Sequence, residues 1–330
     1  MGLLTRIRKR VRSACRRDVR TDGGTRTAGG VRSLLPDVSR EFVQALPFWL
    51  PPFLLMALFV YGAIGWNFVI SLTDFHGLQL PAYAVSNFDL EMYRRAYSDP
   101  RFWTAARNTA VLLVSFTSLC LVVGLGVAIL VDQKIRFENT FRTIYLLPMS
   151  LSFVVTAYFW LWMYNPDTGA INVLLRQVGL GALASNWIGN PQLVLGAIVF
   201  ALIWQFSGYA MVVYLAGLRA IPTEHYEAAR VDGASTYKMY RRVILPQLRA
   251  STISAAVVLM VFALKAFDFL YAMFGKNPGP AADILATMMY RQAFAATNWA
   301  YGSAIAIVLF ALALAIIGPY LYLEYRRGEL

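Results

Sequence analysis

Residues 222–246 read PTEHYEAARVDGASTYKMYRRVILP, a polar and basic stretch that separates two long apolar runs. Asp232-Gly233 divides the stretch into two parts, each with the residue spacing of a short helix. Glycine tolerates a positive φ, so Gly233 can reverse the chain, and Pro246 is expected to stop the second helix. The sequence therefore predicts a rigid projection, or peg, of two short helices that another protein could bind. We call residues 222–246 the peg loop.

Both predicted helices of the peg loop carry start signals. Thr223 and Ser235 are residue types that cap helix N-termini. Tyr237, Tyr240 and Ile244 recur at i, i+3 and i+7, which gives the second helix an apolar face. An amphipathic loop at the membrane surface would have the same face, so this face alone does not identify a docking element.

The whole chain is too apolar for a soluble protein of 330 residues, since 58% of it is hydrophobic and its mean hydropathy is +0.53. An apolar run of about 18 residues or more can cross a hydrocarbon core. Six such runs are present, at approximately 50–72, 109–131, 143–164, 192–218, 250–274 and 302–324. Backbone groups in lipid need partners within their own segment, so the sequence predicts an all-α membrane protein with six transmembrane helices.

Local signals refine these spans. Asn108-Thr109 is expected to open the second span, after an outer loop at 73–108 that forms a helical cap. Gly124 and Gly126 are expected to let this span approach a neighbouring helix closely. Pro148 should kink the third span near its middle.

Positive charge is distributed unevenly along the chain. Of 30 Lys and Arg residues, 11 fall in the tail at residues 1–45. In the orientation that places the tail, alternate loops and the C-terminus on one side of the membrane, these segments together hold 22, including those 11. The opposite loops hold seven. Cytoplasmic loops are enriched in Lys and Arg, so both termini are expected to be cytoplasmic, with the basic residues facing lipid headgroups rather than nucleic acid. We expect a basic tail at 1–45 and one six-helix domain at 46–330 in a plasma membrane.

Lys265 and Asp268 stand at i and i+3 in the fifth span. An ionised group at the bilayer centre costs roughly 2.5–3.5 kcal/mol, so such residues face a cavity or each other. The two side chains therefore either line a polar pathway or form a structural ion pair between helices. A proton or cation relay is a third interpretation. It is weakly supported, because a relay needs further carboxylates and this pair is isolated.

Other polar and aromatic groups at membrane depth are candidates for the same pathway. Trp204 and Tyr209 flank Ser207 in the middle of the fourth span, and lipid does not favour such groups. If the solute is a sugar, a carboxylate could bind its hydroxyls while an aromatic ring stacks on it. The candidate pathway residues are Trp204, Ser207, Tyr209, Lys265, Phe267, Asp268 and Tyr271.

Patterns for catalysis, metal binding and ATP binding are missing from the sequence. It has no GxxxxGK[ST], no HExxH and no triad, and GKNPGP at 275–280 is not a phosphate-binding loop. His76 and His225 are expected on opposite sides of the membrane, which excludes a joint metal site. We therefore expect no catalytic residue, no metal and no cofactor in this chain, and any energy must come from a partner.

The peg loop resembles the cytoplasmic EAA loop of inner-membrane subunits of ATP-driven importers. That pattern is Glu-Ala-Ala, three residues, Gly, nine residues, an aliphatic residue, one residue and Leu-Pro. Every spacing is matched here, with Val243 where Ile is usual. The resemblance implies a coupling helix seated in a cleft of an ATPase. The residues that it assigns to coupling are Glu227, Ala228, Ala229, Asp232, Gly233, Arg241, Leu245 and Pro246.

Three further stretches resemble the carbohydrate-uptake, or maltose-type, permeases of binding-protein-dependent ABC importers. They are NPDTGAIN at 165–172, AFDFLYAMFGKNPGP at 266–280 and YGSAIAIVLF at 301–310. GKNPGP departs from the Thr-x-Gly-Gly-Gly-Pro that is frequent there. The resemblance covers about residues 46–330 and implies a type I importer transmembrane domain, similar to the first permease of a heterodimer. It implies as partners a second permease, two ATPase subunits that use ATP and Mg, and an extracytoplasmic solute-binding protein.

The implied function is sugar import by alternating access, with a monosaccharide such as glucose ahead of an oligosaccharide or glycerol phosphate. Two other classes remain open. A proton-coupled secondary transporter would have no use for the peg loop. A membrane receptor or scaffold would use that loop to bind a different cytosolic partner.

Overall fold

The computed structural model describes residues 40–78, 88–133 and 136–327, and these residues form helices and connecting turns without strands. The chain divides into two compact units, residues 1–58 and 59–330. The described part of the first unit consists of α2 (Arg40–Met56) and the first residues of the π-helical η1 (Ala57–Tyr61). The predicted basic tail falls almost wholly outside the described residues.

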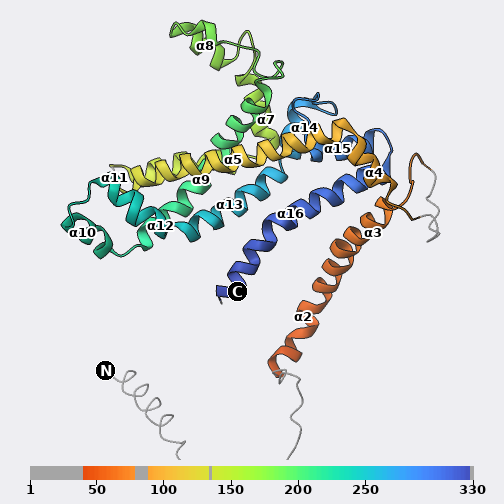
Figure 1. Cartoon of the computed structure of the whole chain (residues 1–330), viewed down its shortest axis with the longest axis horizontal. Coiled ribbons are helices and arrows are strands. Elements are labelled where there is room, and N and C mark those ends of the chain that lie inside the picture. Colours follow the sequence, from red (N-terminus) through yellow and green to blue (C-terminus); the bar gives the residue numbers. More distant parts are fainter. Residues whose placement is uncertain (1–39, 79–87, 134–135, 328–330) are drawn as a thin grey trace, which may run out of the picture. The chain divides into compact units, whose positions relative to one another are not determined.

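The second unit is built of long helices with short helices between them in the chain (Figure 1). The all-α prediction is confirmed for the described residues. The long helices are α5 (Pro100–Asp132), α9 (Val194–Ala220), α13 (Arg249–Leu264) and α16 (Trp299–Arg327). The shorter ones before the peg loop are α3 (Gly62–Ser71), α4 (Glu91–Ser98), α6 (Glu138–Leu146), η3 (Leu147–Ser150), α7 (Phe153–Met163), α8 (Ala170–Gln177) and η4 (Gly181–Leu183). Those after it are α14 (Phe267–Phe274), α15 (Leu285–Tyr290) and η6 (Arg291–Ala295).

Five segments of the described chain are long and apolar enough to cross a membrane: Ala45–Ser71, Pro100–Asp132, Val194–Ala220, Arg249–Phe274 and Trp299–Tyr322. A sixth candidate is a pair, Glu138–Ser150 and Phe153–Met163, whose halves are bent by 99°. Five of the six predicted spans therefore correspond to these helices, and the predicted third span corresponds to the bent pair, which has the geometry of a broken span or of a re-entrant loop.

The break in the third span comes just after the predicted kink at Pro148. Pro148 lies in η3, and the chain turns at Leu151 and Ser152. The Ser152 hydroxyl accepts a hydrogen bond from the Val155 N–H at 3.3 Å and so caps α7. From α9, Gln205 Nε2 donates to the Leu151 carbonyl at 2.9 Å. A polar side chain of a neighbouring span thus satisfies a backbone group that the break leaves without a helical partner.

The second span begins earlier than the sequence predicts. Asp99 is the N-cap of α5, where its side chain accepts from the Arg101 N–H at 2.9 Å, and Pro100 occupies the first helical position. Asn108 and Thr109, predicted to open the helix, lie inside it. The loop ahead of it is helical in part, at α4.

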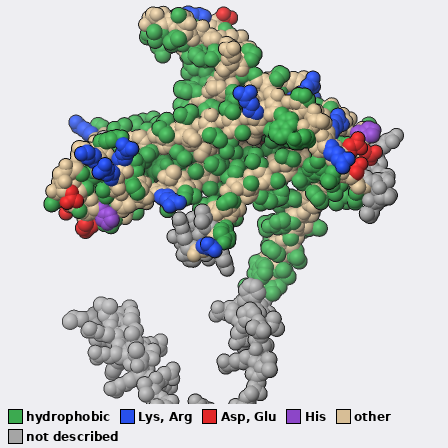
Figure 2. Space-filling model, in the orientation of Figure 1, with side chains coloured by type: hydrophobic (Ala, Val, Ile, Leu, Met, Phe, Trp, Pro, Cys, Tyr) green, Lys and Arg blue, Asp and Glu red, His purple; other side chains and the backbone are tan. Residues whose placement is uncertain are grey.

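Helix α9 is the centre of the bundle. Two thirds of its most apolar window, 67%, is buried inside the protein, against 33% for α5 and 11% for α16. Figure 1 shows α5 running beside α9 and α13. On the face seen in Figure 2, hydrophobic side chains cover the middle of the bundle, and most Lys and Arg side chains gather towards its two ends. This distribution suits a bundle embedded in lipid.

Close packing of α5 on α9 depends on one of the two predicted glycines. A Cβ added at Gly124 would collide with the Ala210 side chain and lie 2.8 Å from the Met211 backbone nitrogen. The prediction is confirmed for Gly124. It is wrong for Gly126, where an added Cβ would meet nothing within 4 Å.

We expect Gly124→Ala to lower the stability of the purified chain by about 1–3 kcal/mol, because the new methyl group overpacks a helix contact that is already backbone to backbone. Gly126→Ala is the matched control, since it adds the same methyl group to the same helix in open space. The measurement is the thermal unfolding midpoint of both variants in detergent. Equal midpoints would contradict the assigned contact.

Candidate functional site

The peg loop folds as α10 (Thr223–Val231), α11 (Thr236–Met239), the π-helical η5 (Tyr240–Ile244) and α12 (Leu245–Gln247). It lies at one end of α5 and α9, and α14 and α15 lie towards the other end (Figure 1). Gly233 has φ +70°, as the sequence predicts. The Gly233 N–H donates to the Arg230 carbonyl, and the Ala234 N–H donates to the Ala229 carbonyl, both at 3.0 Å. These two bonds form a Schellman motif, which fixes the direction in which the chain leaves α10.

Three local predictions for the peg loop need correction. Pro222, not Thr223, occupies the N-cap of α10. Ser235 is at the N-cap of α11, but its side chain makes no capping hydrogen bond. Pro246 does not stop the helix, because α12 runs on to Gln247. A proline is tolerated in the first turn of a helix, where its missing N–H has no helical acceptor to lose.

The buried face of the second half also differs from the prediction. Met239, Ile244 and Leu248 are almost fully buried. Their spacing is five and then four residues, as expected when a π-helical turn replaces an α-helical one. Tyr237, predicted to lie on this face, is 71% exposed, and Tyr240 is half-buried.

The predicted coupling residues fall into two groups. Glu227, Ala228, Asp232, Gly233, Arg241 and Pro246 are exposed. Ala229 and Leu245 instead pack against the core of the chain. Val231, which the sequence analysis missed, is 87% exposed next to the turn. Together with Tyr237 it places large apolar groups on an otherwise polar loop, which is typical of a surface that contacts another protein.

The root of the peg loop carries ion pairs that the sequence does not predict. Arg219, in the last turn of α9, has Nε 3.7 Å from Asp132 Oδ1, and its Nη2 donates to Glu138 Oε1. Arg142 Nη1 lies 3.7 Å from the same Glu138 oxygen. Asp132 ends α5, and Glu138 begins α6, so Arg219 joins the ends of three helices directly before Pro222.

Two tyrosines of the peg loop contact the same region. The pKa of Tyr226 is raised, chiefly because the phenol is shielded from water and also because of the negative charge of Asp132. Burial and Asp132 raise the pKa of Tyr240 as well, against a lowering by Arg230. The influence of Asp132 on both phenols shows that both helical parts of the loop lie close to the charges at its root.

A cavity of about 300 Å³ lies where the third, fourth and fifth spans meet. Its polar side chains include Gln205 from α9 and Asp268 from α14. Gln205 is 2% exposed, and its Oε1 has no hydrogen-bond partner among the described residues. The broken segment supplies Leu151 and Ser152, and the remaining lining is Met149, Phe153, Val154, Phe206 and Phe262. This hollow offers the Asp268 carboxylate within a largely apolar wall.

The other six predicted pathway residues do not line this cavity. Ser207 is buried and shares a 2.9 Å hydrogen bond with Tyr145 of α6. Trp204 stacks on Phe159, with ring centroids 5.4 Å apart, and Tyr209 is half-buried. Lys265 and Asp268 are both exposed and form no ion pair with each other.

Phe267 and Tyr271 form a separate aromatic cluster with Tyr290. Phe267 stacks on Tyr271 at a centroid distance of 5.4 Å, and the Tyr290 ring lies 5.1 Å from Phe267 and 5.0 Å from Tyr271. The structure thus distributes the predicted pathway residues over several places. Gln205, which lines the cavity with Asp268, lies next to the predicted Trp204 in sequence. It was not among the predicted pathway residues, although an amide side chain within an apolar span is a signal that could have identified it.

Comparisons with known proteins identify the family. Residues 120–326 match the model of the inner membrane component of binding-protein-dependent transport systems. The xylose/arabinose import permease protein XacH of Haloferax volcanii is 55% identical over 294 residues, which cover 89% of this chain and 92% of the relative. The trehalose/maltose transport system permease protein MalF of Thermococcus litoralis is 32% identical over 72% of this chain and 80% of its own length.

A solved structure has the same fold. A bacterial alginate ABC transporter, in complex with its alginate pentasaccharide-bound periplasmic protein, contains a chain that superposes with a TM-score of 0.73. The match covers 88% of this chain and 96% of the other, at 20% sequence identity. The shared feature is therefore the arrangement of helices.

The family match defines the class of this all-helical bundle as the transmembrane subunit of a transporter. This chain belongs to the family of binding-protein-dependent transport system inner membrane components. It is a multi-pass, membrane-integral permease of an ABC importer.

We expect Arg219→Gln to loosen the root of the peg loop without unfolding the bundle. Ion pairs at partly exposed sites contribute about 0.2–1 kcal/mol each, so losing two pairs should raise amide hydrogen exchange in residues 222–231 severalfold. Arg249→Gln is the control, because Arg249 is exposed and forms no ion pair with the described residues. Unchanged exchange in the Arg219 variant would show that these pairs do not hold the loop.

Proposed function

We propose that this chain is one permease of a heterodimer that imports a monosaccharide. In this proposal two copies of a separate ATPase, using ATP and Mg, supply the energy, and an extracytoplasmic solute-binding protein delivers the sugar. Relatives named for xylose/arabinose and for trehalose/maltose support a sugar substrate. The 55% identity to a xylose/arabinose permease makes a pentose the first candidate, with glucose next.

The observation that carries the proposal is the exposed surface of the peg loop. Glu227, Asp232 and Arg241 offer charged groups, and Val231 and Tyr237 offer apolar area beside them. The Schellman turn holds α10 in one direction, so a partner that grips α10 moves a fixed body and not a flexible chain. We infer that the ATPase binds this surface, and that the surface faces the cytoplasm together with both termini.

Helix α9 provides a direct route from that surface to the membrane interior. Its last turn carries Arg219 at the root of the peg loop, and near its middle Ser207 is hydrogen-bonded to Tyr145 of α6. Two residues further along α9, Gln205 is bonded to the break in the third span. A helix transmits displacement along its axis, so a movement of α10 would reach the broken span and open or close the cavity beside it.

The cavity with Gln205 and Asp268 is the proposed sugar contact. A hydroxyl-rich solute loses its hydration in an apolar wall unless polar groups replace the water. The Asp268 carboxylate accepts hydrogen bonds from hydroxyl groups. Trp204, Ser207, Tyr209, Lys265, Phe267 and Tyr271 are proposed to line the same route in other states of the transport cycle.

The decisive experiment on the peg loop uses position 233. Gly233→Val should abolish sugar-stimulated ATP hydrolysis and uptake by the reconstituted importer, because a β-branched residue strongly resists φ +70°. Gly233→Asn is the matched variant: asparagine tolerates a left-handed backbone, so activity should be largely kept.

Two results would contradict this proposal. One is equal activity of the Val and Asn variants. The other is uptake that follows a proton gradient in the absence of any ATPase, which would instead support a secondary transporter.

A second test concerns the cavity. Asp268→Asn should raise the KM for the sugar about tenfold, because hydrogen bonds to a charged acceptor are stronger than those to an amide, and should leave basal ATP hydrolysis unchanged. Asp167→Asn is the control, since Asp167 is an exposed carboxylate of the 165–172 turn. An unchanged KM in the Asp268 variant would remove this residue from the sugar site.

A further inference from the structure

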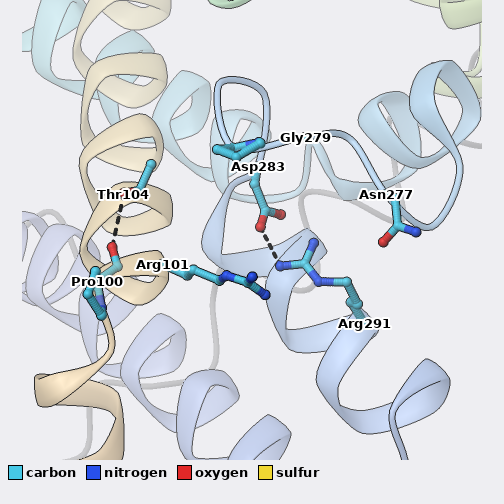
Figure 3. A pocket seen from close by; sticks show the side chains of 8 residues that line it. Pro100, Arg101, Thr104, Asn277, Gly279, Asp283 and Arg291 are labelled. Carbon is cyan, nitrogen blue, oxygen red and sulfur yellow. Dashed lines mark hydrogen bonds and ion pairs between the residues drawn. The ribbon is translucent and has the colours of Figure 1, made fainter.

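A second polar cavity, of about 390 Å³, opens at the N-terminal end of α5. Arg101 and Thr104 of α5 line one wall (Figure 3). The segment between α14 and α15 supplies Asn277 and Asp283, and η6 supplies Arg291. The lining shares no residue with the Gln205–Asp268 cavity.

The carboxylate of this cavity and two nearby backbone carbonyls already accept hydrogen bonds. Asp283 is 6% exposed, its Oδ1 accepts from the Thr287 hydroxyl at 2.7 Å, and its Oδ2 accepts from Arg291 Nη2. The carbonyls of Pro280 and Asp283 accept from Asn108 Nδ2, each at 2.9 Å. These bonds explain why Asn108 lies inside α5, since it fixes the 280–283 segment against this helix.

The donors, by contrast, are largely free. The Arg101 guanidinium and the Asn277 side-chain amide make no hydrogen bond or ion pair with any described residue. Arg291 spends one N–H on Asp283 and carries four more. In Figure 3 the Arg101 and Arg291 side chains point toward one another. Two guanidinium groups therefore share one hollow with a single carboxylate, which leaves an excess of one positive charge and several N–H donors.

We propose that this cavity is a binding site for a small oxyanion, a solute that carries a carboxylate or phosphate group. Such a group supplies acceptors for the free guanidinium N–H groups and neutralises the excess charge of the cavity. Guanidinium forks match the geometry of these groups with two parallel hydrogen bonds. A volume of about 390 Å³ lies within the range of small-molecule sites and exceeds the needs of a bare ion.

A small solute fits the geometry better than an acidic side chain of another protein. Arg291 has only 21% of its side chain exposed, and Asp283 only 8%. A carboxylate on an approaching protein surface would reach Arg101, which is exposed, before it reached Arg291. Contact with both guanidinium groups requires an occupant that enters the hollow.

The test measures binding to the full purified chain in detergent, at constant ionic strength because salt screens exposed charges. Isothermal titration uses D-glucuronate and inorganic phosphate as oxyanions, and D-glucose as the uncharged counterpart of glucuronate. We expect saturable binding of at least one oxyanion and an affinity about tenfold lower in Arg101→Gln, which loses a charge-assisted contact. Arg107→Gln is the matched control, because it removes the same charge from an exposed position of α5 outside the cavity.

Three results would overturn the proposal: no saturable oxyanion binding to the unaltered chain, equal weakening by Arg101→Gln and Arg107→Gln, or oxyanion binding that glucose matches. In a fourth result, neither oxyanion binds, but Arg101→Gln weakens association with the solute-binding protein. That result would reject the cavity as a small-solute site and assign it to contact with that protein. The assay involves neither ATP nor transport, so its failure leaves the proposed import function intact, and a failure of import leaves this assay interpretable.

Discussion

Hydrogen bonding of the backbone inside a hydrophobic bundle is the constraint on which this structure depends. A continuous span satisfies its own peptide groups, but a break exposes some of them where water cannot reach. The third span breaks at Leu151, and the exposed carbonyl receives Gln205 from α9. The segment after α14, where the Pro280 carbonyl is not shielded from water, is also held by Asn108 of α5, through two of its carbonyls. Polar residues in apolar helices serve here first as partners of a neighbour's backbone.

This constraint also explains where the polar cavities lie. A break in a helix creates room as well as unsatisfied groups, so both described polar hollows adjoin irregular backbone. One adjoins the Leu151–Ser152 turn, and the other adjoins the segment that contains Pro280. The two differ in their electrostatics. The first holds a carboxylate, so it suits hydroxyl donors. The second has a surplus of guanidinium N–H groups, so it suits an acceptor-rich ligand.

The sequence allowed the fold to be predicted at the level of spans, and the site only in part. Apolar length is a local property, so the helices followed directly from it. The positive φ of Gly233 was predictable because few other residues adopt it. The start of α5 was missed because Asp99-Pro100 lies ahead of the apolar run, and run length dominated the prediction. The ion pairs of Arg219 were not predictable, since they join α5, α6 and α9 across many residues of chain. Phe267 and Asp268 are adjacent in sequence, yet they face an aromatic cluster and a cavity, a separation set by how α14 packs.

The EAA pattern of the peg loop combines two physical roles that its spacing alone does not separate. Gly233 closes the turn, while Ala229 and Leu245 pack on the core of the chain, so these positions are required by the loop's own fold. Glu227, Asp232 and Arg241 are exposed and make no contribution to that packing. A match to the EAA pattern therefore indicates the fold of the loop more strongly than it indicates which protein binds the loop. Recognition of a particular ATPase should depend on the exposed positions. These include Val231 and Tyr237, which lie outside the pattern and are not among the residues that hold the loop together.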